Sequence, residues 1–375
     1  MSLVESDSIS IRTFLHQTYD GFQAGLNPTQ CILVLGNESF DLDSCVSTLL
    51  LARSLCRSQT KIPLPIMNCH RADFRLRPDI VLILRRIAID SSFLLCIDDL
   101  SPEFLSNIGS IALVDHNRLS IKQEWLSPYV QMIFDHHRDE GGFLHANPRH
   151  VQTCASAATV VAIHAFDANQ FQDADLAFLI LSTIVADSNN FCPILKRITD
   201  SDRHVLQRIS ASTKHIDRDQ LHEAIRSARS DVGSLTTLEL LRRDLKIVEK
   251  GGIRIAISVI PEPISKWHKR DPSWYDHVQS FCIQSSYNFS IVMSTYSNAE
   301  KEGRREIAII HDDGGRNLAL DFQQSLLGHD ELGLMPLPEF NDCNTRVFHQ
   351  QNLQYTRKAM IPIVQEWLIN QQECL

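Results

Sequence analysis

The sequence of 375 residues lacks the features that mark several large classes of protein. No apolar stretch reaches the ~20 residues that a membrane-spanning helix requires, and the run 178–186 ends in a polar Asp-Ser-Asn-Asn segment. The first seven residues lack the basic start and apolar core of a signal peptide, and they are too acidic for a transit peptide. We therefore expect a cytoplasmic protein without a membrane segment.

Paired cysteines and a positive charge balance are also missing. The ten cysteines are scattered, and none forms the Cys-x-x-Cys pair of a structural zinc site. Several lie in apolar runs, as small core residues do in a reducing compartment. The formal net charge of −9 argues against general affinity for nucleic acid. It leaves room for an anionic substrate, because metals and a local basic cluster can set the field inside a cleft.

Short apolar runs alternate with helical patterns through the first half of the chain. We predict strands at Cys31–Gly36, Phe93–Ile97, Ile111–Asp115 and Val130–Asp135, and helices at Ser44–Arg57, Ser156–Ala168 and Asp173–Val185. Periodicity alone would also allow a strand at 179–186, and we favour the helix. This alternation predicts an α/β fold with a parallel sheet covered by helices on both faces.

A second, smaller α/β domain is predicted near the C-terminus. Residues 206–242 are polar and helical and are interpreted as a connection, which places the first domain at 1–205 and the second at 243–375. In the second domain we expect strands at Ile253–Ile260, Phe289–Thr295 and Glu306–His311, and helices at Trp274–Gln284, Leu318–Leu327 and Ile361–Gln371.

Four apolar runs of the first domain end at acidic residues or histidine. The residues concerned are Asp41 and Asp43, then Asp115, then Asp135-His136-His137, and last Asp187. The carboxyl ends of parallel strands share one crevice, so these segments can bring several carboxylates and an imidazole together. Carboxylates so close repel one another unless cations join them, and oxygen ligands with imidazole suit Mg²⁺ or Mn²⁺. The pattern predicts a two-metal hydrolytic site.

Other interpretations of these acids remain open. Asp41 or Asp43 could instead cap the helix that begins nearby. Asp98-Asp99 also follows an apolar run and competes with Asp115 for the same role.

Neighbouring motifs carry weaker signals. Ser44 is interpreted as a helix cap or a site residue, and His116 and Asn117 as residues that shape the loop around a ligand. Arg304-Arg305 is either a polyanion contact or a solvated turn pair. The small-residue helix start 154–159 is expected to pack behind the histidines, and we assign it no chemistry.

The ordered motifs resemble one known family. Gly36-Asn37-Glu38-Ser39-Phe40-Asp41-Leu42-Asp43-Ser44, Val114-Asp115-His116-Asn117, Asp135-His136-His137 and Asp187 together resemble the DHH phosphoesterase superfamily. The set looks most like the eukaryotic exopolyphosphatase and prune branch, with family II inorganic pyrophosphatases as relatives. Tyr355-Thr356-Arg357-Lys358 is similar to the Ser-Arg-Lys motif of the second domain in these enzymes. The resemblance implies an active site in a cleft between the two domains.

The resemblance also implies a role for each motif residue. Asp41 would bind one metal ion, with Asn37 at a further ligand position. Asp43, His136 and Asp187 would bind the other ion, and Asp115 would bridge both. His137 would face the substrate phosphate or help hold its metal, and Arg357 and Lys358 would bind phosphate. A lysine of the pyrophosphatases has a similar role, for which Lys266, Lys269 and Arg270 are all candidates here.

Two departures refine the expected function. Asn37 stands where the pyrophosphatases have a metal-binding histidine, and an amide is a weaker transition-metal ligand, so Mg²⁺ gains over Mn²⁺. Animal prune proteins tend to have Asp-His-Arg where this chain has Asp135-His136-His137. We therefore expect an exopolyphosphatase that releases orthophosphate from inorganic polyphosphate. A prune-like hydrolase of short polyphosphates or cyclic nucleotides, a pyrophosphatase, a nuclease and a non-catalytic regulatory binding protein remain alternatives.

Overall fold

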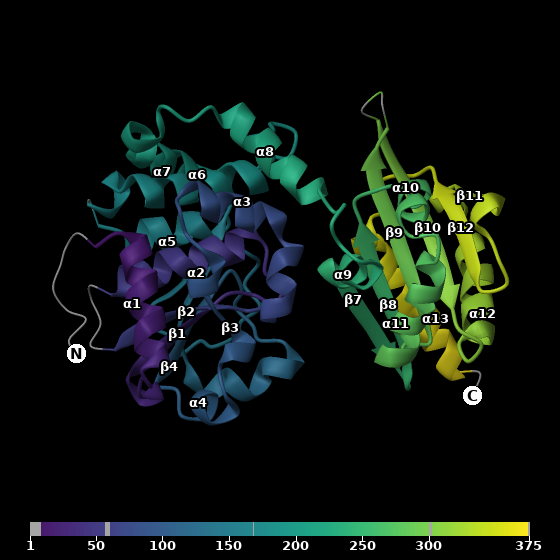
Figure 1. The fold of residues 1–375 in the computed structure, drawn as a ribbon, viewed down its shortest axis with the longest axis horizontal. Helices are drawn as coiled ribbons and strands as arrows, with labels where there is room; N and C mark the ends of the chain where they lie inside the picture. Colours follow the sequence, from purple (N-terminus) through teal and green to yellow (C-terminus); the bar gives the residue numbers. More distant parts are fainter. Residues whose placement is uncertain (1–8, 57–60, 168, 299, 301, 374–375) are drawn as a thin grey trace. The chain divides into compact units, whose positions relative to one another are not determined.

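The computed structural model describes residues 9–56, 61–167, 169–298, 300 and 302–373. The chain forms two compact units, Met1–Arg229 and Ser230–Leu375, each built from one sheet and its helices (Figure 1). This arrangement confirms the predicted α/β fold, with a parallel sheet in the first unit. Within the described residues, no helix is both long and apolar enough to cross a membrane.

The first unit contains a six-stranded sheet. Its strands are β1 (Cys31–Leu35), β2 (Ile62–Met67), β3 (Leu95–Cys96), β4 (Ser110–Val114), β5 (Val130–Asp135) and β6 (Arg149–Val151). They run in the order β3-β2-β1-β4-β5-β6, and every neighbouring pair is parallel. The chain order reverses between β1 and β4. Ligands of open parallel sheets bind at such a reversal, beyond the carboxyl ends of the strands.

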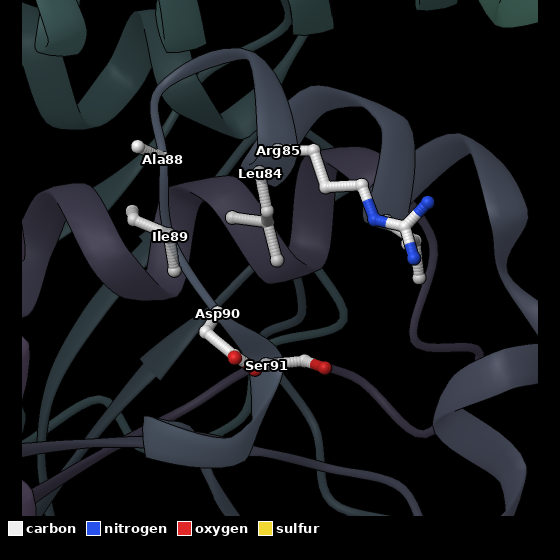
Figure 2. A pocket seen from close by; sticks show the side chains of 7 residues that line it. Leu84, Arg85, Ala88, Ile89, Asp90 and Ser91 are labelled. Atoms are coloured by element: carbon white, nitrogen blue, oxygen red, sulfur yellow. The ribbon is translucent and has the colours of Figure 1, made fainter.

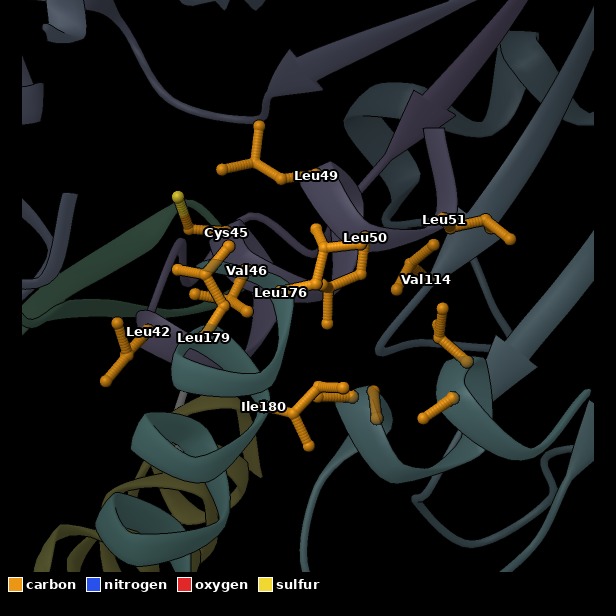
Figure 3. Close-up of a cluster of buried hydrophobic side chains, with 14 of the residues drawn as sticks. Leu42, Cys45, Val46, Leu49, Leu50, Leu51, Val114, Leu176, Leu179 and Ile180 are labelled. Carbon is orange, nitrogen blue, oxygen red and sulfur yellow. The ribbon is translucent and has the colours of Figure 1, made fainter. Parts of the chain in front are cut away.

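The central strands β1 and β4 are buried on both faces of this sheet, which explains why their sequences are almost entirely apolar. Ile32 and Val34 of β1 belong to one core cluster, while the alternate residues Leu33 and Leu35 belong to another on the opposite face. Figure 3 shows the first cluster, where leucines of α2 pack against residues of α6 and against Val114. The helices of this unit are α1 (Ile11–Gln23), α2 (Leu42–Leu55), α3 (Pro78–Arg86), α4 (Pro102–Ser106), α5 (Ala157–Ala165), α6 (Ala174–Asp187), α7 (Asp200–Thr213) and α8 (Arg218–Ser230).

The local predictions differ from the structure at β3 and β2, among other places. The expected strand Phe93–Ile97 shrinks to β3, because short 3-10 helices at Ser91–Phe93 and Ile97–Asp99 flank it. Strand β2 was not predicted, since its Ile-Pro-Leu-Pro-Ile-Met sequence contains two prolines that usually exclude a strand from a sheet interior. Arg57 and Ala168, the expected ends of two helices, lie outside the described residues.

The helical segment expected to connect the domains is divided between the two units. Val205 of α7 and Leu221 of α8 are buried in the core of the first unit. Because their apolar faces complete that core, the first unit extends to Arg229, beyond the boundary expected at residue 205. The last helix of the segment, α9 (Thr237–Arg243), lies in the second unit.

The second unit contains a mixed sheet in the order β11-β12-β10-β9-β8-β7. In the part of this sheet that the structure describes, β8 and β9 pair in parallel and the other neighbouring strands pair antiparallel. Phe289, Phe322 and Trp367 pack with ring centroids 5.3–5.9 Å apart in the core between the sheet and its last two helices. The elements are β7 (Leu245–Lys250), β8 (Ile253–Ile260), α10 (Ile264–Arg270), α11 (Trp274–Ser285), β9 (Phe289–Ser297), β10 (Gly303–His311), α12 (Arg316–Leu327), β11 (Leu334–Pro336), β12 (Thr345–Gln350) and α13 (Arg357–Glu373).

Candidate metal centre

The loop between β1 and α2 brings the first acidic pair to the carboxyl edge of the sheet. Gly36 permits the tight passage, because a Cβ atom there would lie 2.3 Å from Ser44 Oγ and 3.1 Å from the Ser44 carbonyl oxygen. Asp41 caps α2 by accepting a hydrogen bond of 3.0 Å from the Ser44 amide. Ser44 Oγ in turn accepts a hydrogen bond of 2.8 Å from the backbone amide of Asn37. Asp41 is therefore the N-cap residue of α2, and this role occupies its Oδ1.

Asp43 lies in the first turn of α2 and points at the start of another helix. Its carboxylate accepts hydrogen bonds from the backbone amides of Ala157 (2.6 Å) and Ala158 (3.1 Å) at the N-terminus of α5, and from Ser47 Oγ (2.9 Å). A helix N-terminus favours a negative charge. Burial nevertheless raises the pKa of Asp43, because the carboxylate is 2% exposed.

Asp115 follows β4 in a left-handed backbone conformation with φ of 63°. A residue with a side chain adopts this conformation at a cost, and such positions cluster at functional sites. Its Oδ2 accepts a hydrogen bond from Asn37 Nδ2 at 2.7 Å, whereas its buried Oδ1 has no hydrogen-bond donor among the described residues. Burial, followed by repulsion from Asp43 and Asp41, raises the pKa of Asp115 well above its usual value.

The two histidines after β5 differ in orientation. His136 Nδ1 lies 3.1 Å from the Cys154 carbonyl oxygen, so it carries the proton and leaves Nε2 free as a ligand atom. That Nε2 lies 3.2 Å from Asp115 Oδ1 and 3.6 Å from Asp43 Oδ2. His137 is more exposed, and its Nδ1 lies 2.9 Å from Asp135 Oδ1. This hydrogen bond to Asp135 raises the pKa of His137.

Asp187, the last residue of α6, belongs to the same electrostatic neighbourhood. Burial raises its pKa well above the usual value, and the negative charges of Asp43 and Asp41 raise it further. Carboxylates from three separate segments of the chain, at Asp41 and Asp43, at Asp115 and at Asp187, therefore lie close enough to repel one another.

This donor set fits a divalent cation. One ligand atom each from Asp115, His136 and His137 lies within 4.8 Å of the others, an arrangement that could hold a metal ion. Among the described residues the buried Asp115 Oδ1 has no hydrogen-bond donor, and burial, followed by repulsion from Asp43 and Asp41, raises the pKa of both Asp115 and Asp187, so a cation here would offset concentrated negative charge. Carboxylate oxygens with one or two imidazoles match the preferences of Mg²⁺ and Mn²⁺.

Asn37 contacts this cluster through its nitrogen. Its Nδ2 donates to Asp115 Oδ2 (2.7 Å) and to the Asp115 carbonyl oxygen (3.1 Å), while its Oδ1 accepts the Ser39 amide at 2.9 Å. An amide nitrogen that donates two hydrogen bonds is not a metal ligand. The structure thus places Asn37 beside a predicted ligand, with its oxygen already occupied by the loop.

The competing acidic pair has another partner. Arg71 Nε donates to Asp99 Oδ1 at 3.0 Å, and the Arg71 amide donates to Asp98 Oδ1 at 2.9 Å. Asp99 therefore forms an ion pair with Arg71 beside β3, and Asp98 accepts a hydrogen bond from the Arg71 backbone amide. Both aspartates already have partners, so Asp115 is the better candidate for the metal ligand. Asn117, which the sequence suggested as a residue that shapes the loop or orients its neighbours, is 2% exposed and donates to Asp135 Oδ2 at 2.5 Å.

The basic candidates of the second unit differ in how firmly they are held. Arg357 begins α13, and its guanidinium contacts Asp244 through Oδ1 (2.7 Å) and the carbonyl oxygen (2.5 Å). The next residue, Lys358, is exposed. Arg270 lies 2.5 Å and Lys266 3.7 Å from the buried carboxylate of Glu262.

Two further cations complete this comparison. Lys269 is exposed, and among the described residues it makes no ion pair. Arg305 was expected in a contact with a polyanion or in a solvated turn, yet it is 6% exposed and donates to the carbonyl oxygens of Leu353 (3.0 Å) and Tyr355 (2.7 Å). It therefore supports the loop before α13.

A cavity of about 330 Å³ lies elsewhere on the first unit, beside the end of α3 (Figure 2). It is lined by Val81, Leu84, Arg85, Ala88, Ile89, Asp90 and Ser91. None of the predicted ligands lines it, so this cavity is separate from the candidate metal centre.

Comparison with known proteins identifies the family. Residues 31–184 match the DHH family, N-terminal domain, and residues 223–367 match the DHHA2 domain. A protein of Schizosaccharomyces pombe named "Putative exopolyphosphatase" is 30% identical over 350 residues, which cover 89% of this chain and 90% of that protein. The chain belongs to the DHH family.

Other relatives agree with this assignment. "Exopolyphosphatase PRUNE1" of Homo sapiens is 29% identical to this DHH protein over 357 residues, or 93% of this chain and 78% of the human protein. A "putative family II inorganic pyrophosphatase" of Methanococcus jannaschii shares the fold, with a TM-score of 0.58 and 19% identity over 90% of this chain and 99% of that one. The predicted resemblance to the exopolyphosphatase and prune branch is confirmed.

Proposed function

We propose that this DHH protein is a metal-dependent exopolyphosphatase of the cytoplasm. The main support is the convergence of Asp43, Asp115 and His136 on one buried place, where Asp115 Oδ1 has no hydrogen-bond donor among the described residues. The substrate class rests on the names of its relatives. The compartment rests on the cysteines, since all nine that the structure describes are free thiols.

The proposed ligands divide between two ions, Mg²⁺ or Mn²⁺. Asp41 would hold one ion, Asp43, His136 and Asp187 would hold the other, and Asp115 would contact both. When bound, such a pair lowers the pKa of a water molecule towards ~7 and offsets negative charge on the phosphate. Asn37 would act on Asp115 through its amide nitrogen, which fixes the carboxylate that both ions share.

The remaining site residues would bind and orient the phosphate. The hydrogen bond to Asp135 raises the pKa of His137, and in its protonated form His137 can donate from Nε2 to a phosphate oxygen. Asn117 holds Asp135 in place. Arg357 would supply a planar fork for two phosphate oxygens, and Lys358 a point charge.

The chemistry would be an in-line displacement at the terminal phosphorus. Water adds to that phosphorus, the bond to the bridging oxygen breaks, and the shortened chain keeps the bridging oxygen while orthophosphate leaves. Cationic side chains offset the charge of the equatorial oxygens. The neutral Asn37 in place of a histidine disfavours a dedicated pyrophosphatase.

The decisive experiment compares substrates on the purified full chain with Mg²⁺ or Mn²⁺. Orthophosphate release is measured from long polyphosphate, tripolyphosphate and pyrophosphate, and AMP formation is measured from cyclic AMP. Turnover of long chains with pyrophosphate left over supports the proposal. Activity confined to tripolyphosphate or cyclic AMP would favour the prune-like alternative, and silence on all four would favour a binding protein.

An Asp43→Ala variant tests the metal centre itself. The variant should lose turnover, because Asp43 is a proposed ligand, and circular dichroism must show that it stays folded, since three hydrogen-bond donors lose their acceptor. Undiminished turnover by a folded variant would refute the assignment of the site.

A further inference from the structure

A fully buried carboxylate lies behind the metal centre. Asp202, near the start of α7, is 0% exposed and has no cationic partner among the described residues. Its Oδ1 accepts hydrogen bonds from the Ala155 amide (3.1 Å) and from Thr159 Oγ1 (2.7 Å). Its Oδ2 accepts from the Ala155 amide (3.0 Å) and from the amide (2.8 Å) and hydroxyl (2.7 Å) of Thr199. A buried charge persists only when it is satisfied in this way.

The segment that Asp202 holds makes direct contact with two proposed ligands. The Cys154 carbonyl oxygen, one residue before Ala155, accepts the hydrogen bond that orients His136. The amides of Ala157 and Ala158 donate to the carboxylate of Asp43. One short segment, 154–159, therefore sets the position of an imidazole and of a carboxylate.

We propose that Asp202 is a positioning residue of the metal centre. Asp202 holds the 154–159 segment through its hydrogen bonds to Ala155 and Thr159. The segment in turn positions His136 and Asp43 through its own hydrogen bonds to them. Replacing a group that hydrogen-bonds directly to a metal ligand typically changes metal affinity about 10–100-fold, and Asp202 holds the segment that supplies such groups to His136 and Asp43. The inference rests on the proposed function, since it requires that Asp43 and His136 bind metal.

Asp202 also has a local role that the test must separate. Together with Thr199 it forms the capping box of α7, so its loss lowers stability whether or not metal is bound. The two threonines provide matched probes, because each donates a hydroxyl hydrogen bond of 2.7 Å to a different oxygen of the same carboxylate. Thr159 lies on the side of the metal centre, and Thr199 lies on the side of the helix cap.

The experiment measures Mn²⁺ binding by calorimetry on metal-stripped full-length protein. The variants are Asp202→Asn, Thr159→Val and Thr199→Val, each checked by thermal melting and circular dichroism. Asparagine retains the volume of aspartate but can accept hydrogen bonds on one side only. We expect Asp202→Asn to weaken Mn²⁺ binding by up to about tenfold and Thr159→Val several-fold, because both act on the ligands through the 154–159 segment. Thr199→Val should lower the melting temperature and leave the Mn²⁺ affinity within about twofold.

Each outcome bears on the proposal. Wild-type affinity in folded Asp202→Asn, or equal losses in the two threonine variants, would reduce Asp202 to a structural residue and overturn the inference. A wild-type chain that binds no Mn²⁺ and no Mg²⁺ would overturn the metal centre itself, and the inference with it. Weakened binding restricted to Asp202→Asn and Thr159→Val would support both.

Discussion

The amide nitrogen of Asn37 lies 2.7 Å from Asp115 Oδ2, and it also reaches the Asp115 carbonyl oxygen at 3.1 Å. The loop after β1 and the loop after β4 are thus joined at the point where the order of the strands reverses. This contact occupies one oxygen of Asp115 and leaves Oδ1 free to face His136, which lies 3.2 Å away. A polar residue at position 37 therefore decides which oxygen of Asp115 is available to a cation.

An Asn37→His variant should change the preference between metals. An imidazole at this place can ligate a transition metal directly, so the affinity for Mn²⁺ should rise several-fold relative to that for Mg²⁺. The measurement is the ratio of the two dissociation constants from calorimetry. The control is Asn37→Ala, which removes the hydrogen bonds to Asp115 without adding a ligand and should weaken both metals. An unchanged ratio in the histidine variant would argue against a ligand position here.

The assignment of Asp115 over Asp98 can be tested with the same substitution at both positions. Asp115→Asn should reduce polyphosphate turnover at least about 100-fold, because the proposed bridging carboxylate loses its charge. Asp98→Asn should keep turnover within about twofold, since Asp98 contacts Arg71 and His70. Initial rates of phosphate release at saturating Mg²⁺ decide the comparison. Equal effects of the two variants would show that the competing acidic pair had been dismissed wrongly.

The stability of the metal-free protein should depend on pH through the buried acids. Burial raises the pKa of Asp43, Asp115 and Asp187. An acid with a higher pKa in the folded state stabilises the fold below its unfolded pKa of ~4, and this contribution is lost as pH rises through the folded pKa. With EDTA, this cluster should therefore lower the melting temperature as the pH rises above ~4.

Bound metal should remove that penalty. We expect the melting-temperature increase produced by saturating Mg²⁺ or Mn²⁺ to grow with pH over the same range, because cations and protons compete for the same carboxylates. Differential scanning fluorimetry at a series of pH values, with EDTA or with metal, gives the difference directly. The Asp115→Asn variant serves as control and should show a shallower slope. A metal effect independent of pH would contradict the expectation.

Arg357 and Lys358 should separate substrate binding from stability. Lys358→Gln should raise the KM for polyphosphate several-fold at unchanged melting temperature, because Lys358 is exposed. Arg357→Gln should raise KM as well and lower stability by about 1 kcal/mol, since its guanidinium holds Asp244. Steady-state kinetics and thermal melts measure the two effects. Lys250→Gln on β7 removes the same charge from an exposed lysine outside the motif, and it should change neither quantity.

The sequence by itself determined the elements whose signals are local. Strands β1, β4 and β5 follow from their largely apolar runs, because a strand buried on both faces needs mostly apolar residues, and β8 follows from its short β-branched sequence. The order of the acidic and histidine motifs was likewise sufficient to indicate the family. The prolines of β2 carried no such local signal, since that strand is held by the parallel neighbours on its two sides.

Only the tertiary structure decided which side chains meet. The burial of Arg305, the ion pair of Asp98-Asp99 with Arg71, and the hydrogen bonds of Asp202 to Ala155 all join segments far apart in the chain. Such pairings depend on how the elements pack, and no local pattern encodes them. For the same physical reason the sequence named Asn37, Asp43 and His136 as candidates, whereas the fold determined which atom of each faces its neighbours.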